Sequence, residues 1–202
     1  MQFFEKELQT VTRDGGESES VDPGTLSTLA SLSLFGKEAE KQIICTEILK
    51  YGGNLNQAFF LCHRNIQYFG LPDTPIYTAA AIYLVQHHQV KKIDDLLKNI
   101  KPLLPDSEWD KVIRACVDGY VALKEDKSAE RMVTYLKLDT NKIDANIACG
   151  KLKAAYLIAV RANKDNAVEV QRIRQAAILI DSKTMVALCD AYFKEMAGNR
   201  GV

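Results

Sequence analysis

The feature that most constrains this chain is a succession of amphipathic helical segments with readable ends. From Lys37 onward, apolar residues recur at spacings of three and four, which is the period of one face of an α-helix. Asn54 and Ser182 stand where helices should begin, whereas Gly52, Gly70, Gly150 and Gly198 stand where helices should end. No stretch alternates apolar and polar residues for long enough to indicate a strand. The sequence therefore predicts an all-α fold.

The predicted helices, about ten in number, come in pairs, and the pairs recur at a regular interval. Starts of pairs lie about 34 residues apart, a period typical of helix-turn-helix solenoids, near Lys37, Asp73, Ser107 and Asn141. A single pair cannot bury its apolar stripe alone, so neighbouring pairs must stack. We therefore expect a tetratricopeptide-like (TPR-like) α-solenoid, with a closed helical bundle as the alternative.

The first part of the chain differs from the rest in composition. Residues 13–24 are rich in glycine, serine and acidic residues, which is typical of a mobile loop. We expect residues 1–24 to form a short N-terminal helix and a flexible linker, and residues 25–202 to form the helical-repeat domain.

The periodicity also predicts which side chains face the core. Apolar residues at helical spacing are assigned to the core by this pattern, among them Ile43, Val90, Ile180 and Leu188.

Composition narrows the class of protein. The 26 Lys and Arg residues balance the 26 Asp and Glu residues, which argues against nucleic acid as a partner because phosphate binding needs an excess of basic side chains. The five cysteines are odd in number, are widely spaced and lie within apolar helical patterns, so we interpret them as reduced core residues. The most apolar stretch, Ile76 to Val85, is too short to span a bilayer.

No motif for catalysis or for a cofactor stands out. His63, His87 and His88 lack the ligand spacing of a zinc site, and we expect the His87–His88 pair to lie between two helices. Phosphate-binding loops and nucleophile elbows are absent from the sequence. The adjacent carboxylates Asp94 and Asp95 fall on the polar face of a predicted helix. We therefore expect neither an enzyme nor a bound cofactor.

One group of charges is a candidate for binding a partner. Four basic residues cluster around the helix predicted at Leu152, and they are Lys151, Lys153, Arg161 and Lys164. They could bind an acidic protein or an anionic lipid head group. The alternative is a solvated helix face, because no aromatic residues are interleaved with them for stacking on bases.

Two blocks of sequence carry a resemblance to a known family. LFGKEAEKQIICTEILKYGGNLNQAFFL at residues 34–61 and NKIDANIACGKLKAAYLIAVR at residues 141–161 resemble the C-terminal end of the spastizin family of FYVE zinc-finger proteins. The string KLKAAYLIAV is the most specific part. LPDTPIYTAAAIYLV and QRIRQAAILIDSKTMVALCDAYF fit the same segment in order, so the likeness covers most of the chain after the linker.

The resemblance implies a function that composition alone does not indicate. Members of this family act with spatacsin and the AP-5 adaptor complex on late endosomes and lysosomes, in autophagic lysosome reformation, and at the midbody in cytokinesis. Their FYVE finger binds a phosphoinositide through C-x-x-C zinc ligands, which are missing from this sequence, so FYVE-type lipid binding is not expected here. The predicted function is a protein-interaction scaffold in the cytoplasm. A stand-alone TPR-like adaptor that binds peptides in its groove is the alternative.

Overall fold

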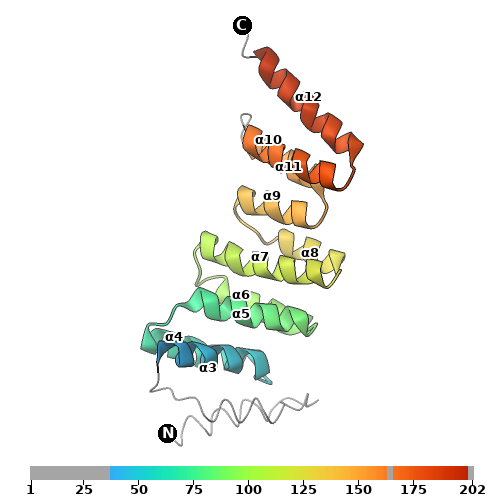
Figure 1. The fold of residues 1–202 in the computed structure, drawn as a ribbon. Coiled ribbons are helices and arrows are strands. Elements are labelled where there is room, and N and C mark those ends of the chain that lie inside the picture. The colour runs from blue at the N-terminus through green and yellow to red at the C-terminus, as the bar shows by residue number, and fades with distance from the viewer. Residues whose placement is uncertain (1–36, 163–165, 200–202) are drawn as a thin grey trace, which may run out of the picture. The chain divides into compact units, whose positions relative to one another are not determined.

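The computed structural model describes residues 37–162 and 166–199, and all regular structure in these ranges is helical. The ten described helices are α3 (Glu38–Tyr51), α4 (Leu55–Phe69), α5 (Asp73–Gln86), α6 (Val90–Ile100), α7 (Asp106–Ala122), α8 (Asp126–Val133), α9 (Asp139–Ala148), α10 (Leu152–Ala162), α11 (Ala167–Leu179) and α12 (Lys183–Asn199). Figure 1 shows them in chain order. The all-α helical-repeat fold is thus confirmed. The N-terminal helix and linker predicted for residues 1–24 lie outside the described residues.

The helices form pairs at the predicted interval. The first helix of each of four successive pairs begins at Glu38, Asp73, Asp106 or Asp139, within two residues of the predicted starts. Within each unit, the strong contacts join helices one or two positions apart in the chain, such as α3 with α4 and α5, or α10 with α9 and α11. Contacts with near neighbours are typical of helical-repeat proteins.

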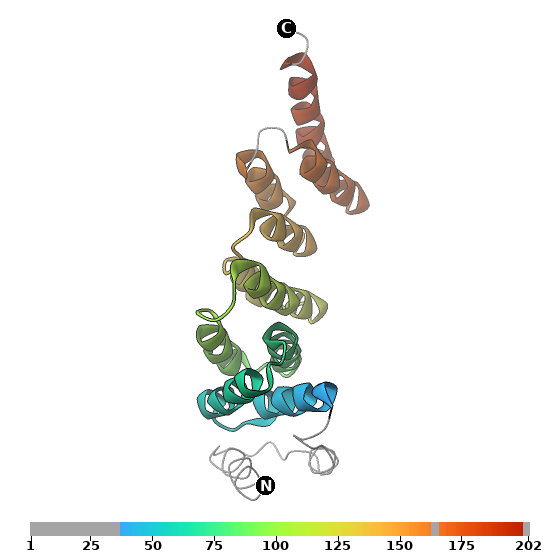
Figure 2. The same ribbon diagram turned by 90° about the vertical axis from the view of Figure 1, so that its left-hand side faces the viewer.

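The chain divides into two compact units, one up to Ala115 and one from Cys116 onward. The division falls inside α7, whose apolar side chains are buried along its length, from Trp109 to Tyr120. Figure 2 shows the helices of each unit from a second direction.

In the first unit, α3 packs against α4 and α5, and α6 packs against α4 and α5. Helix α5 lies between two neighbours and is apolar almost all round, as expected of a helix buried on several sides. Its largest fully buried side chains are Ile76, Tyr77 and Leu84. The core of this unit is therefore built from large residues.

The core of the second unit combines alanines with larger side chains. Helix α9 contacts α8 and α10, α10 contacts α11, and α11 contacts α12. Ala155, Ala159 and Ala177 are fully buried in this core. Larger residues complete the cluster, among them Ile143, Val170, Ile173, Met185 and Tyr192.

The helix ends confirm some capping predictions and correct others. The Asn54 side chain accepts hydrogen bonds from the backbone N–H groups of Asn56 and Gln57, as an N-cap should. Gly70 and Gly150 adopt the left-handed conformation, with φ of 62° and 70°, which glycine tolerates because it has no Cβ.

Two further glycines differ from Gly70 and Gly150. Gly52 ends α3 as predicted, with φ of −60° and so outside the left-handed region. Gly198 lies inside α12, which continues to Asn199. The prediction that Gly198 stops this helix is wrong, because a glycine near a helix end terminates it only where the backbone turns.

The inward assignments are mostly correct, with four exceptions. Ile43, Val90, Ile180 and Leu188 were predicted to face the core but are exposed. Each lies at the edge of its apolar stripe or at a helix end, where the helical period alone does not decide between core and solvent. Of these, Ile180 lies between α11 and α12.

Candidate partner-binding site

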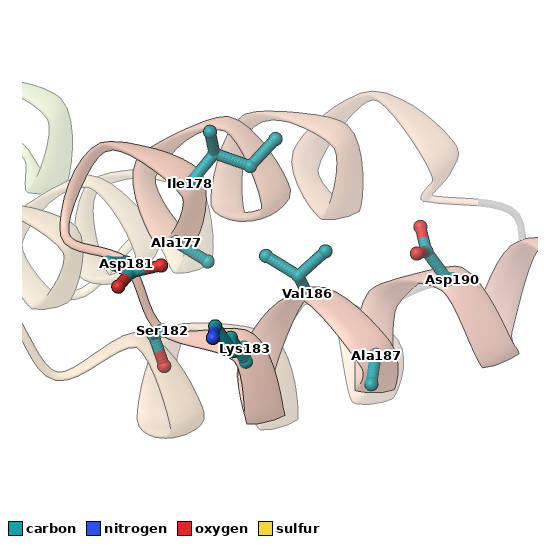
Figure 3. Close-up of a pocket in the computed structure, with 8 residues that line it drawn as sticks. All are labelled: Ala177, Ile178, Asp181, Ser182, Lys183, Val186, Ala187 and Asp190. Atoms are coloured by element: carbon teal, nitrogen blue, oxygen red, sulfur yellow. The ribbon is translucent and has the colours of Figure 1, made fainter.

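A pocket of about 280 Å³ lies between the end of α11 and the first turns of α12. Ala177 and Ile178 come from α11, and Val186, Ala187 and Asp190 come from α12. In Figure 3, Ala177 and Val186 project into the space between the two helices, and Asp190 lies further along α12. The lining is completed at the connecting turn by Asp181, Ser182 and Lys183.

The turn that carries these residues has a fixed geometry. Asp181 has a positive φ of 53°, a conformation that aspartate tolerates better than most residues. The Ser182 N–H donates to the carbonyl oxygen of Ala177 at 2.8 Å, and the Asp181 N–H donates to that of Ile178 at 3.1 Å. These bonds close the end of α11, so the pocket lies on a defined backbone.

A run of large apolar side chains begins at Ile178, which lines the pocket, and continues along the chain. Ile178, Leu179 and Ile180 are 52%, 86% and 60% exposed. We call these three residues, together with Val186 and Ala187 of the pocket, the α11–α12 ledge. Single exposed apolar side chains are ordinary on protein surfaces, but contiguous ones mark sites of interaction.

Ion pairs hold the two helices of the ledge in place. The Arg174 Nε of α11 donates to Asp190 Oδ1 of α12 at 2.6 Å, and this hydrogen bond raises the pKa of the Arg174 guanidinium. Arg172, also on α11, pairs with Glu169 at 2.8 Å and with Asp144 of α9 at 2.5 Å. Because such part-exposed pairs each contribute little to stability, their main effect here is to fix the orientation of α11.

The structure describes three of the four basic residues predicted to bind a partner. Lys153 and Arg161 are exposed and, being eight residues apart on α10, share one face with Leu157 between them. Lys151 instead pairs with Glu130 of α8 at 2.8 Å, and this hydrogen bond raises the pKa of Lys151. Lys164 lies outside the described residues. The structure therefore retains Lys153 and Arg161 as a smaller basic face, with Leu157 exposed between them.

The histidines and carboxylates considered for catalysis or metal binding have roles in packing and helix ends. His63 Nδ1 lies 3.1 Å from the Tyr77 hydroxyl, and His87 caps the C-terminus of α5. Asp95 pairs with Lys98 on the same helix. Among the described residues, no three His, Cys, Asp or Glu side chains are grouped so as to hold a metal ion, and none of the helices there combines the length and apolar character needed to cross a membrane.

Sequence reasoning missed the ledge because it assigned Ile180 to the core and made no assignment for Ile178 and Leu179. The string AAILI at residues 176–180 contains more adjacent apolar residues than one helix face can bury. Five consecutive residues cover more than a full turn, so some of them must point away from the core. That excess was the available signal for a surface patch.

Comparison with known proteins agrees with this architecture. The family described as ZFYVE26-like, TPR repeats matches residues 72–194. Zinc finger FYVE domain-containing protein 26, or spastizin, is 30% identical in Ailuropoda melanoleuca and 29% identical in Homo sapiens, each over 170 residues. The match covers 83% of this chain and 7% of those proteins.

A more distant organism supplies a similar match. A protein of Dictyostelium discoideum is 31% identical over 169 residues, which is 80% of this chain and 6% of that protein. No solved structure matches the chain significantly. The chain thus corresponds to a small fraction of the length of its relatives. The family match covers more than half of the chain, so the chain belongs to the ZFYVE26-like family of TPR-repeat proteins.

Proposed function

We propose that this chain is a non-enzymatic helical-repeat scaffold and that the α11–α12 ledge is one of its binding surfaces for protein partners. The observation that supports this most is the exposure of Ile178, Leu179 and Ile180 in one uninterrupted run. Leaving three large apolar side chains in water forgoes hydrophobic stabilisation. A partner that covers them would recover it.

The shape of the ledge favours a helical partner segment. Two helices with a pocket between them form a groove into which the apolar face of an amphipathic helix can pack, with anchors spaced three and four residues apart. Val186 and Ala187 would form the floor of this groove, and Ile178 one wall. Lys153 and Arg161 on α10, with Lys151 and Lys164, are proposed as a second contact that attracts acidic residues of a partner.

By family, we propose that the partners are spatacsin and the AP-5 adaptor complex. The chain would then act, in the cytoplasm, at late endosomes and lysosomes in autophagic lysosome reformation, and at the midbody in cytokinesis. A groove lined by lysine and asparagine would favour the alternative function, a stand-alone peptide-binding adaptor. The apolar lining of the ledge supports the scaffold instead.

Binding of the purified chain to purified spatacsin and to purified AP-5 would test the proposal. Ile178→Glu combined with Leu179→Glu should weaken binding about tenfold or more, because both charges would be placed against an apolar partner face. Phe60→Glu is the matched control, since Phe60 is a 68% exposed apolar residue in the first unit. Lys153→Glu with Arg161→Glu tests the basic face separately.

The possible outcomes test the proposed surface and the proposed partners separately. Loss of binding in the ledge variant with no change in the Phe60 variant supports the ledge. Absence of binding by the unmodified chain to either partner would contradict the proposed partners. Equal binding by the ledge variant and the unmodified chain would contradict the proposed surface.

A further inference from the structure

The α11–α12 ledge combines an apolar hollow with apolar side chains that protrude beside it. The hollow is the pocket of about 280 Å³, and four of the eight residues that line it are apolar. The protruding side chains are Leu179, which is 86% exposed, and Ile180, which is 60% exposed. These two residues lie in the chain between Ile178 and Asp181, which both line the pocket. Because consecutive Cα atoms are only about 3.8 Å apart, the hollow and the protruding side chains belong to one surface.

The pocket is large enough for an aliphatic side chain from another molecule. A cavity of about 150 Å³ holds a benzene-sized molecule, whereas this pocket has a volume of about 280 Å³. Leu179 does not line the pocket of its own chain. The pocket of one copy can therefore accept the Leu179 side chain of a second copy.

The charges on the rim of the pocket have opposite signs. Asp181 and Lys183 lie at the turn between the two helices (Figure 3), and both are exposed. No ion pair joins either of them to another residue in the described part of the chain. The other charge in the lining, Asp190, is already paired with Arg174 at 2.6 Å. The rim thus offers one negative and one positive charge to an incoming molecule.

A surface with these properties is complementary to itself. In a two-fold dimer the same patch occurs on both subunits, so each contact between two different residues occurs twice. A two-fold axis through the ledge would place Leu179 of each copy at the pocket of the other. It would also place Asp181 of each copy opposite Lys183 of the other.

The balance of charge favours a second copy over a phosphate group or a strongly acidic segment. Both of those ligands are attracted by an excess of positive charge. The rim instead carries one charge of each sign in Asp181 and Lys183. A second copy matches both signs, and it supplies an apolar side chain of the size that the pocket accepts.

We propose that the ledge of one copy binds the ledge of a second copy about a two-fold axis. The proposal rests on the function proposed above, in which the ledge is a binding surface, and it adds a form of regulation. Self-association covers the same side chains that a protein partner would cover. Dimer formation and partner binding therefore compete.

The dimer should be weak, because few side chains form the ledge and small interfaces are typical of transient association. We expect dimers at a protein concentration of about 100 µM and monomers at about 1 µM. A weak dimer leaves the ledge available to a partner that binds more tightly.

Sedimentation velocity of the full chain without any partner tests the dimer. Leu179→Glu should raise the dissociation constant more than about tenfold, because it places a carboxylate at the apolar pocket of the other copy. Phe60→Glu is the matched control, since Phe60 is a 68% exposed apolar residue outside the ledge, and it should leave the dissociation constant unchanged.

Charge reversal tests the two-fold arrangement. Asp181→Lys should raise the dissociation constant about threefold to tenfold, because two lysines would then face each other, and Lys183→Asp should do the same with two aspartates. The variant that carries both changes restores opposite charges across the axis and should dimerise like the unmodified chain. Position 181 accommodates a lysine, since Lys124 has φ of 59° where Asp181 has 53°. Circular dichroism checks that each variant is folded.

The outcomes for the dimer are distinct from those for partner binding. A chain that remains monomeric at about 500 µM would overturn the dimer, whatever its affinity for spatacsin or AP-5. Equal dimerisation by Leu179→Glu and the unmodified chain would also overturn it, as would a double charge variant that dimerises no better than the single ones. Addition of a bound partner should convert dimers into complexes with one copy of the chain, and a complex that retains the dimer would contradict the competition.

Discussion

The two units of this chain differ in how their exposed apolar side chains follow one another in the sequence. In the first unit, α5 has helices on two sides and buries Ile76, Tyr77 and Leu84 almost completely. The large apolar side chains that stay exposed there, such as Phe60 and Tyr68, are separated along α4. In the second unit, Leu179 and Ile180 follow Ile178 directly, and all three are exposed. Because a repeat buries its apolar face only where a neighbouring helix covers it, the comparison favours the end of α11 as the surface that a partner covers.

The largest expected effect comes from a charge in the first unit's core. Ile93→Asp places a carboxylate where the side chain is fully buried, and should lower the free energy of unfolding by about 4 kcal/mol or more. Thermal unfolding followed by circular dichroism measures it. A melting curve like that of the unmodified chain would show that α6 does not form the core described here.

The next largest effect is expected at alkaline pH, where a buried tyrosine in the first unit should affect stability more than one in the second unit. Burial raises the pKa of Tyr77 and, to a smaller extent, that of Tyr156. A raised pKa means that the folded state keeps a proton that the unfolded state loses above about pH 10. The free energy of unfolding therefore falls as pH rises beyond that value. For a buried group the fall is about 1.4 kcal/mol per pH unit. Tyr77→Phe should flatten this decline more than Tyr156→Phe, as measured by urea unfolding at a series of pH values. Equal slopes for the two variants would contradict the difference in burial.

A larger side chain in place of a buried alanine should destabilise the core of the second unit. Ala159 is fully buried in that core, and Ala159→Leu should cost about 1–3 kcal/mol because no space is left for the added carbons. Ala162→Leu, at an exposed position of the same helix, is the control and should change stability little. If Ala159→Leu were neutral in denaturant unfolding, α10 and its neighbours would not be closely packed.

A smaller effect is expected at the start of α4. Asn54→Ala removes the side chain that accepts two backbone hydrogen bonds and should cost about 1 kcal/mol. Asn54→Ser should retain most of that stability, since serine is also a good N-cap. Chemical denaturation of both variants would show whether the cap acts as described.

Helix caps could be predicted from the sequence, whereas the burial of individual side chains depended on how neighbouring helices pack. Asn54 and Gly70 were predictable because capping depends on a few adjacent residues. The orientation of Val90 and Ile180 was not, because the same helical period can place an edge residue toward a neighbour or toward water. Leu179 and Ile180 look like core residues in the sequence, and only the position of α12 shows that nothing in the described chain covers them.

The basic residues around Leu152 stay a prediction as a binding site. Lys153 and Arg161 are exposed on one face of α10. The pairing of Lys151 with Glu130 could not be predicted, since it joins α8 to the residue that precedes α10 and depends on how the two segments pack.

Hydrogen–deuterium exchange on the complex tests the central claim most directly. The chain alone and the chain bound to spatacsin or AP-5 would be compared peptide by peptide. We predict that binding slows exchange across residues 167–190, which include the ledge, and leaves α4 unchanged. Protection confined to the first unit, with exchange at α11 and α12 unaltered, would contradict the account.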